Sequence, residues 1–93
     1  MLTPKEIAYE VTKALDAKKG QNIKLLKIER VSSLADYFLI CTGTSSTHVK
    51  TLCDYAGYTL EQLGEQMLSR EGHRGNSWEL LDYGSIVVHV FTE

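Results

Sequence analysis

The stretch Tyr37-Phe-Leu-Ile-Cys-Thr-Gly-Thr-Ser-Ser-Thr-His48 decides how the chain folds. Residues 37–42 are nearly all apolar and favour β-structure, which predicts a central strand covered on both faces. Gly43 ends that strand, and the hydroxyl-rich residues after it are typical of a capped helix start. A strand, a Gly/Thr/Ser turn and a helix N-terminus in series can also cradle a phosphate. The stretch therefore leaves two interpretations open, an anion site or a tight corner.

A helix over residues 4–18 is predicted ahead of this strand. Thr3 can cap it, Pro4 suits its first position, and Glu6 completes a capping box. Its apolar stripe, which recurs at spacings of three and four residues and stops near Gly20, is Ile7, Ala8, Val11, Ala14 and Leu15.

The remaining elements follow from the same kind of periodicity. Residues 23–29 alternate as Ile23 and Leu25 against Lys24 and Leu26, which predicts a strand with at least one partly wet face. After the corner, the predicted elements are a helix over residues 46–63, stopped by Gly64, and strands over residues 67–71, 77–83 and 85–92.

The order αββαβββ predicts an α/β fold over residues 1–93 as a single domain. The sheet of about five strands should be mixed, with a crossover after the second strand and an antiparallel hairpin, turning at Tyr83-Gly84, at the end. We expect the helices to pack mainly on one face, so that the other face is less covered.

Composition and length set the class of protein. The chain has 93 residues, of which 43% are hydrophobic and 24% charged, and no apolar run approaches the roughly 18 to 20 residues that span a bilayer. The start of the chain lacks a basic segment followed by an apolar one, so no secretory signal is predicted. We therefore expect a soluble, cytoplasmic domain that does not engage a membrane.

Charge is unevenly distributed along the chain. Residues 1–30 carry seven Lys/Arg against four Asp/Glu, and residues 31–93 carry three against eight, within a net charge of -2. The acidic second part argues against wrapping nucleic acid, and no direct sequence-specific nucleic-acid binding is predicted. It allows attraction to a basic partner, or it is solvated charge with no partner.

No cofactor or metal site is predicted. Cys41 and Cys53 both lie in apolar patterns and fit small buried hydrophobes in a reducing compartment. The three histidines, His48, His73 and His89, are scattered and lack the spacing of a structural zinc site. His89 fits a hydrogen-bonded or half-exposed strand residue better than a ligand.

The sequence also predicts no catalytic residues. Phosphoryl or nucleotidyl transfer needs magnesium held by carboxylates, typically two residues apart on a strand, and the chain has no such Asp/Glu pair. The Gly43 turn lacks the Gly-Lys of a P-loop. Ser45, Ser46, His48 and Asp36 could form a triad on paper, but nothing in their spacing favours one.

Four segments together resemble a known family. They are Ser32-Ser-Leu-Ala-Asp-Tyr-Phe38, Cys41-Thr-Gly-Thr-Ser45, His48-Val49 and Trp78-Glu-Leu-Leu-Asp-Tyr-Gly-Ser-Ile-Val-Val-His-Val-Phe91. The pattern is similar to the Iojap family of ribosomal silencing factor S proteins, and it covers nearly the whole chain. Ser85 departs from the family, which usually has an acidic residue there, and family members usually continue past this chain's last residues with a polar and aromatic segment.

The resemblance implies a fold and a function. The fold would look like that of nucleotidyltransferases, and the protein would bind protein fourteen of the large ribosomal subunit. Binding would block joining of the small subunit and lower translation when nutrients are scarce. The alternatives are a homodimeric interaction module and a degenerate, nucleotidyltransferase-like nucleotide binder.

The predicted partner-binding residues are Asp36, Tyr37, His48, Trp78, Glu79, Asp82 and Tyr83. Each also has a structural interpretation. Asp36 and Asp82 can accept backbone N–H bonds at strand ends, and His48 can simply be solvated. Trp78 and Tyr83 are five residues apart on a strand and so lie on opposite faces, which allows at most one of them to share a face with the helices.

Overall fold

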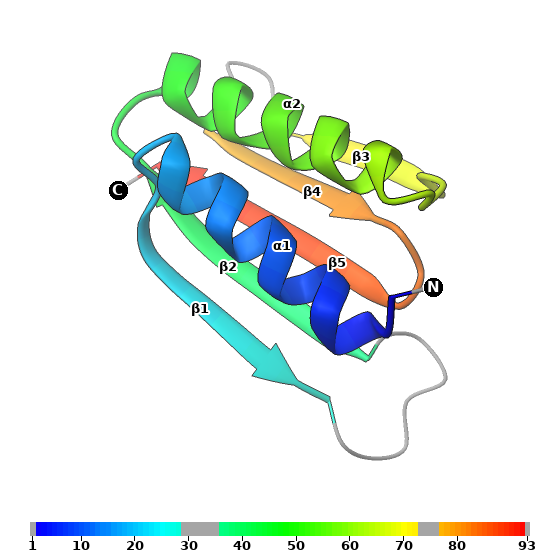
Figure 1. The fold of residues 1–93 in the computed structure, drawn as a ribbon. Helices are drawn as coiled ribbons and strands as arrows, with labels where there is room; N and C mark the ends of the chain where they lie inside the picture. The colour runs from blue at the N-terminus through cyan, green and yellow to red at the C-terminus, as the bar shows by residue number, and fades with distance from the viewer. Residues whose placement is uncertain (1, 29–35, 73–76, 93) are drawn as a thin grey trace.

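The computed structural model describes residues 2–28, 36–72 and 77–92. Its elements, in the predicted order, are α1 (Pro4–Ala17), β1 (Gln21–Lys27), β2 (Tyr37–Gly43), α2 (Ser46–Gln62), β3 (Ser69–Gly72), β4 (Trp78–Asp82) and β5 (Ile86–Thr92). Both helices lie side by side on the same face of the sheet (Figure 1). The predicted α/β class, element order and one-sided helix layer are confirmed.

Helix α1 begins with the predicted capping box. The Thr3 hydroxyl accepts a hydrogen bond from the Glu6 N–H at 3.2 Å, and a Glu6 carboxylate oxygen accepts one from the Thr3 N–H at 2.9 Å. These bonds lower the pKa of Glu6. At the other end the left-handed residue is Lys19, with φ 64°, and not Gly20. Gly20 is needed for space, because a Cβ there would lie 2.5 Å from the Cys41 sulfur.

The sheet runs in the order β1-β2-β5-β4-β3. β2 and β5 pair in parallel at its centre, and the other pairs are antiparallel. The mixed sheet and the terminal hairpin are therefore confirmed. Gly84 makes the hairpin turn with φ 82°, and its N–H donates to the Asp82 carboxylate at 2.8 Å.

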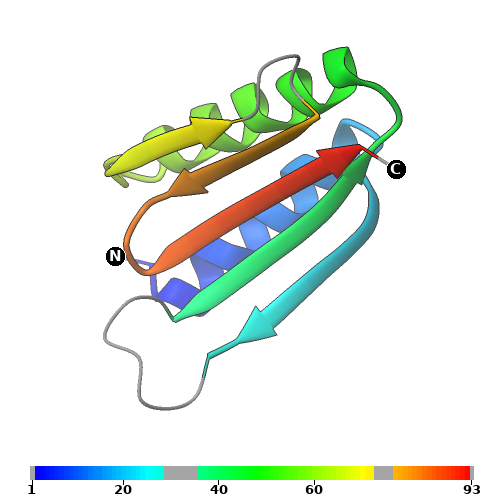
Figure 2. The same ribbon diagram turned by 180° about the vertical axis from the view of Figure 1, so that it is seen from behind.

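Two local predictions are corrected. β2 is central, but its burial alternates along the strand, because helices cover one face only (Figure 2). The third strand begins at Ser69, two residues later than predicted, because Met67 packs against the core instead of joining the ladder. The segment 29–35 and the segment 73–76, which hold Glu29 and His73, lie outside the described residues.

The core lies between the helix layer and the facing side of the sheet. Its fully buried members with the largest side chains are Leu15, Leu39, Leu52, Leu60, Leu81 and Ile86. The predicted stripe of α1 is buried at all five positions. The core therefore uses only one set of alternating strand residues and leaves the other set facing away from the helices.

Candidate functional site

The face of the sheet turned away from both helices is called the open face here (Figure 2). The strand register arranges its side chains in three rows. The strand register places Leu26, Phe38, Val87, Asp82 and Ser69 in one row. It places Lys24, Ile40, His89, Leu80 and Glu71 in the central row. Thr42, Phe91 and Trp78 form the third.

The middle of the open face is apolar and aromatic. The His89 ring lies 5.6 Å from the Phe38 ring and 6.2 Å from the Phe91 ring, measured between centroids. These neighbours bury His89 in part, and this burial lowers its pKa. Leu26, at the margin, is 43% exposed. A continuous apolar surface of this kind on a sheet is typical of a site that another macromolecule covers.

Trp78 and Tyr83 lie on opposite sides of the sheet, as predicted. Trp78 pairs with Phe91 in the register and is half-buried on the open face. Tyr83 is only 4% exposed and belongs to the core, where its hydroxyl has no hydrogen-bond partner among the described residues. Tyr83 contacts α2 closely, since a Cβ added at Gly57 would lie 3.3 Å from the hydroxyl oxygen. Of the two aromatics, Trp78 is the one available to a partner.

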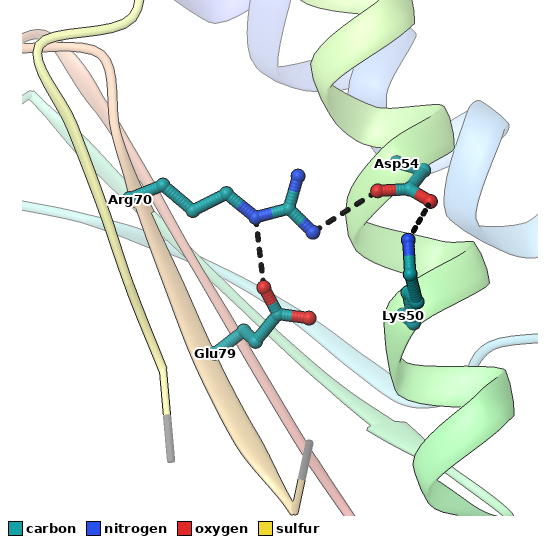
Figure 3. A network of polar contacts seen from close by, with 4 residues as sticks. All are labelled: Lys50, Asp54, Arg70 and Glu79. Carbon is teal, nitrogen blue, oxygen red and sulfur yellow. Dashed lines mark hydrogen bonds and ion pairs between the residues drawn. The ribbon is translucent and has the colours of Figure 1, made fainter. Parts of the chain in front are cut away.

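Glu79 points under α2 into a polar network (Figure 3). The Arg70 Nε donates to one Glu79 carboxylate oxygen at 2.8 Å, and Arg70 Nη2 donates to Asp54 at 3.0 Å. Asp54 also pairs with Lys50 at 3.0 Å. Glu79 is 6% exposed, and its second oxygen is buried without a partner in the part of the chain that the structure describes. The prediction that Glu79 contacts a partner is therefore revised to a role in tying β4 to β3 and α2.

His48 joins the two helices. Its Nδ1 accepts a hydrogen bond from the Thr44 N–H at 2.8 Å, which leaves the ring proton on Nε2 to be donated to the Lys18 carbonyl, also at 2.8 Å. The Ser45 hydroxyl accepts from the His48 N–H at 3.1 Å and caps α2 as predicted. The Thr44 N–H is thus already used at the Gly43 corner. A phosphate there would have to compete with the imidazole.

Asp36, Tyr37 and Asp82 are held by backbone contacts. The N–H groups of Asp36 and Tyr37 both donate to the Ser85 carbonyl, at 2.8 and 3.0 Å. Tyr37 is 8% exposed, on the helix side. Asp36 and Tyr37 also line a cavity of about 300 Å³ with Thr3, at the start of α1. Asp82 both accepts from the hairpin turn and stands on the open face.

The sequence prediction found part of the open face. Trp78 and Asp82 were named from their strand, whereas Phe38, Ile40, Leu80 and Phe91 were not. The signal for them was the alternation within the strands, read together with the one-sided helix layer. Among the described residues, no group of three or more His, Cys, Asp or Glu side chains could hold a metal ion, and neither helix is long and apolar enough to cross a membrane.

The fold and the open face define a class of small α/β domain built around a sheet with one uncovered side. Residues 2–93 match the family described as "Ribosomal silencing factor during starvation". The chain belongs to this family, whose described role is regulatory.

Relatives and solved structures agree with this assignment. The chain is 36% identical to the ribosomal silencing factor RsfS of Bacillus subtilis, over 97% of this chain and 76% of that protein. It is 30% identical to the chloroplastic protein Iojap of Zea mays, over 90% of this chain and 36% of that one. A crystal structure of a Chromobacterium violaceum protein superimposes with a TM-score of 0.92 at 32% identity, covering 98% of this chain and 76% of the other. A second crystal structure, from Bacillus halodurans, superimposes with a TM-score of 0.85 at 31% identity, covering 95% of this chain and 82% of the other.

Proposed function

We propose that this protein binds the large ribosomal subunit through protein fourteen of that subunit and sterically prevents the small subunit from joining, which represses translation in the cytoplasm. The observation that carries the proposal is the apolar open face in a chain that belongs to the ribosomal silencing factor family. Apolar and aromatic side chains at the centre of an interface supply most of its binding energy.

The size of the domain suits occlusion. Its principal extents are 33 × 25 × 22 Å, with a radius of gyration of 12.1 Å. A rigid body of that thickness between two subunits keeps their surfaces from meeting closely. The function needs no reacting group, only an affinity sufficient to compete with subunit joining.

We assign the centre of the contact to Trp78, with Leu80 and Phe91 as neighbours and Asp82 at its acidic side. Trp78 and Phe91 are opposite each other in the β4–β5 pair, and Leu80 lies next along β4. Asp82 is half-buried, and its carboxylate would attract a basic protein surface and speed its approach. Glu79 and Tyr83 contribute by holding β4 in place beneath α2.

Co-sedimentation with purified large subunits tests this assignment. Trp78→Ala should lower binding at least about tenfold, since truncating a central aromatic commonly costs about 2 kcal/mol or more. Tyr58→Ala is the matched control, because Tyr58 is an aromatic side chain 57% exposed on α2, in the opposite layer. A folded Trp78→Ala protein that sediments with large subunits as fully as the control would overturn the assignment. A subunit-joining assay with the same two variants would then show whether binding and occlusion change together.

A second candidate function is a homodimeric interaction module. The observation that favours it is again the open face, since an uncovered apolar sheet side can pair with its own copy about a two-fold axis. Light scattering over a range of concentrations would reveal a dimer. If the dimer and the large subunit use the same face, adding large subunits should dissociate the dimer.

The nucleotide-binding alternative has less support. The Gly43 corner has the shape of an anion site, but His48 occupies the Thr44 N–H that an anion would need. We expect no change in the fold's thermal stability on adding ATP and magnesium. A clear rise in melting temperature would reopen this alternative.

A further inference from the structure

The charged residues of the open face are separated by sign. The central row begins at Lys24 on β1 and ends at Glu71 on β3, and Ile40, His89 and Leu80 lie between them. Since neighbouring strands are about 4.8 Å apart, the Cα atoms of Lys24 and Glu71 are roughly 19 Å apart. The face therefore has a basic margin and an acidic margin around an apolar middle.

Asp82 strengthens the acidic margin. It lies on β4 beside β3, where it pairs with Ser69, two residues before Glu71. Among the described strand residues, the open face carries one cation and two anions, Lys24 against Glu71 and Asp82. Arg70, the only cation of β3, points to the other side, where it pairs with Glu79.

The margins remain available to a partner. Lys24 and Glu71 are exposed, and within the described ranges neither forms an ion pair. Charges at the rim of an interface contribute little to the final affinity but steer the approach and penalise a wrong orientation. A partner could dock on an apolar strip alone in either of two orientations related by half a rotation. The charged margins make these two orientations different in energy.

We infer that the polarity from Lys24 to Glu71 and Asp82 sets the orientation in which the open face docks. This inference rests on the proposed function, so the partner is a protein surface of the large subunit. That surface has a basic cluster over β3 and β4 and an acidic group over β1. Docking turned by half a rotation would place like charges opposite each other at both margins. The polarity thus restricts the factor to one orientation in which its bulk can block the small subunit.

A charge swap tests the inference. The variants are Lys24→Glu, Glu71→Lys and the double variant carrying both, measured as association with immobilised large subunits at low and at high salt. The double variant keeps the net charge at -2, so any loss of binding reports the arrangement of charge and not its total. We expect each single change to slow association about threefold to tenfold, the double variant to slow it at least about tenfold, and high salt to shrink all three effects.

Matched controls lie in the helix layer. Lys13→Glu and Glu10→Lys change the net charge by the same amounts on the outer side of α1, where the two residues pair at 2.8 Å. They should leave association within about twofold of the unmodified protein, since exposed charges distant from a contact steer it weakly. Circular dichroism of every variant confirms that the fold is retained.

The outcomes separate the inference from the proposed function. If Trp78→Ala loses binding while the double variant associates normally, the open face binds but its polarity does not orient it, and the inference is wrong. If Trp78→Ala also binds normally, the proposed contact face itself fails. A third outcome is that the single changes abolish self-association and the double variant restores it, while none of the variants alters subunit binding. The polarity would then orient a second copy of the chain, and the inference is again wrong.

Discussion

Arg70 and Glu79 form an ion pair of 2.8 Å that joins β3 to β4 beneath α2, and the Glu79 side chain is only 7% exposed. β3 has no buried residue of its own. Its ladder with β4 and the Arg70 side chain are therefore what attach it to the domain, since Arg70 also reaches Asp54 on α2. The hydrogen bond to Glu79 raises the pKa of Arg70, so the guanidinium stays charged at every accessible pH.

The first prediction concerns the loss of this pair. Arg70→Met should lower the free energy of unfolding by about 2–3 kcal/mol, because it leaves a buried carboxylate without its cation. Lys50→Met removes the neighbouring ion pair between Lys50 and Asp54, whose two side chains are 58% and 48% exposed respectively. This change should lower the free energy of unfolding by under about 1 kcal/mol.

Urea denaturation of both variants measures the difference. The double variant Arg70→Met with Glu79→Leu should recover most of the lost stability, since apolar residues of similar volume replace a buried pair well. Equal stability of Arg70→Met and Lys50→Met would show that the buried pair contributes no more than an exposed one.

The second prediction concerns the buried hydroxyl of Tyr83. Because this hydroxyl has no hydrogen-bond partner within residues 2–28, 36–72 and 77–92, Tyr83→Phe should leave the free energy of unfolding unchanged or raise it by up to about 1 kcal/mol. A Cβ added at Gly57 would lie 3.3 Å from the Tyr83 hydroxyl oxygen. Removing that oxygen therefore also makes room for a methyl group at Gly57.

A double-mutant cycle in thermal denaturation follows from this contact. Gly57→Ala should gain about 0.5–1 kcal/mol of helix stability in the Tyr83→Phe background and less in the unmodified protein. If the changes in the free energy of unfolding are strictly additive, the side chains at positions 57 and 83 are not in steric contact.

The third prediction concerns the thiols. Burial raises the pKa of Cys41 to about 11 and that of Cys53 to about 12. Both thiols should therefore be almost wholly protonated near neutral pH and should react with iodoacetamide only after unfolding in urea. Thr51→Cys, at an exposed position of α2, provides a reactive reference thiol in the same fold. Native Cys41 or Cys53 reacting as fast as this reference would contradict the burial of that residue.

Elements were predictable because each buries one periodic set of side chains. The stripe of α1 and the alternation of β4 both specify which residues share a face. They do not specify which face the helices cover, and this is why Glu79 was assigned to a partner when it lies in the interior. That choice depends on how the chain crosses over the sheet between β2 and β5, which pair in parallel although they lie far apart in the sequence.

His48 shows the same limit. Its local signal, a helix start rich in hydroxyls, correctly indicated a side-chain cap, which Ser45 supplies. Its contact with the Lys18 carbonyl spans 30 positions in the chain, so no local pattern could indicate it. Long-range polar contacts of this kind depend on how the helices pack, and packing follows from the whole core.

The fourth prediction is a pH dependence of stability carried by His89. Its neighbours on the open face are apolar or aromatic, and burial among them lowers its pKa below the ordinary value of 6.5. Above that value His89 is neutral in both the folded and unfolded chain, and it adds no pH dependence. Below it the unfolded chain binds the proton first, so the free energy of unfolding falls as the pH falls, until the folded chain is protonated too.

Comparison with His89→Phe isolates this effect, because all other titrating groups are common to both proteins. Urea denaturation from about pH 8 to about pH 5 should show a constant stability difference above the ordinary histidine pKa and a growing advantage of His89→Phe below it.

A partner that covers the open face would bury His89 further and lower its pKa again, so binding to large subunits should also weaken with falling pH in the unmodified protein alone. A difference between the two proteins that stays constant over the whole range would show that His89 remains as well solvated in the folded chain as in the unfolded one.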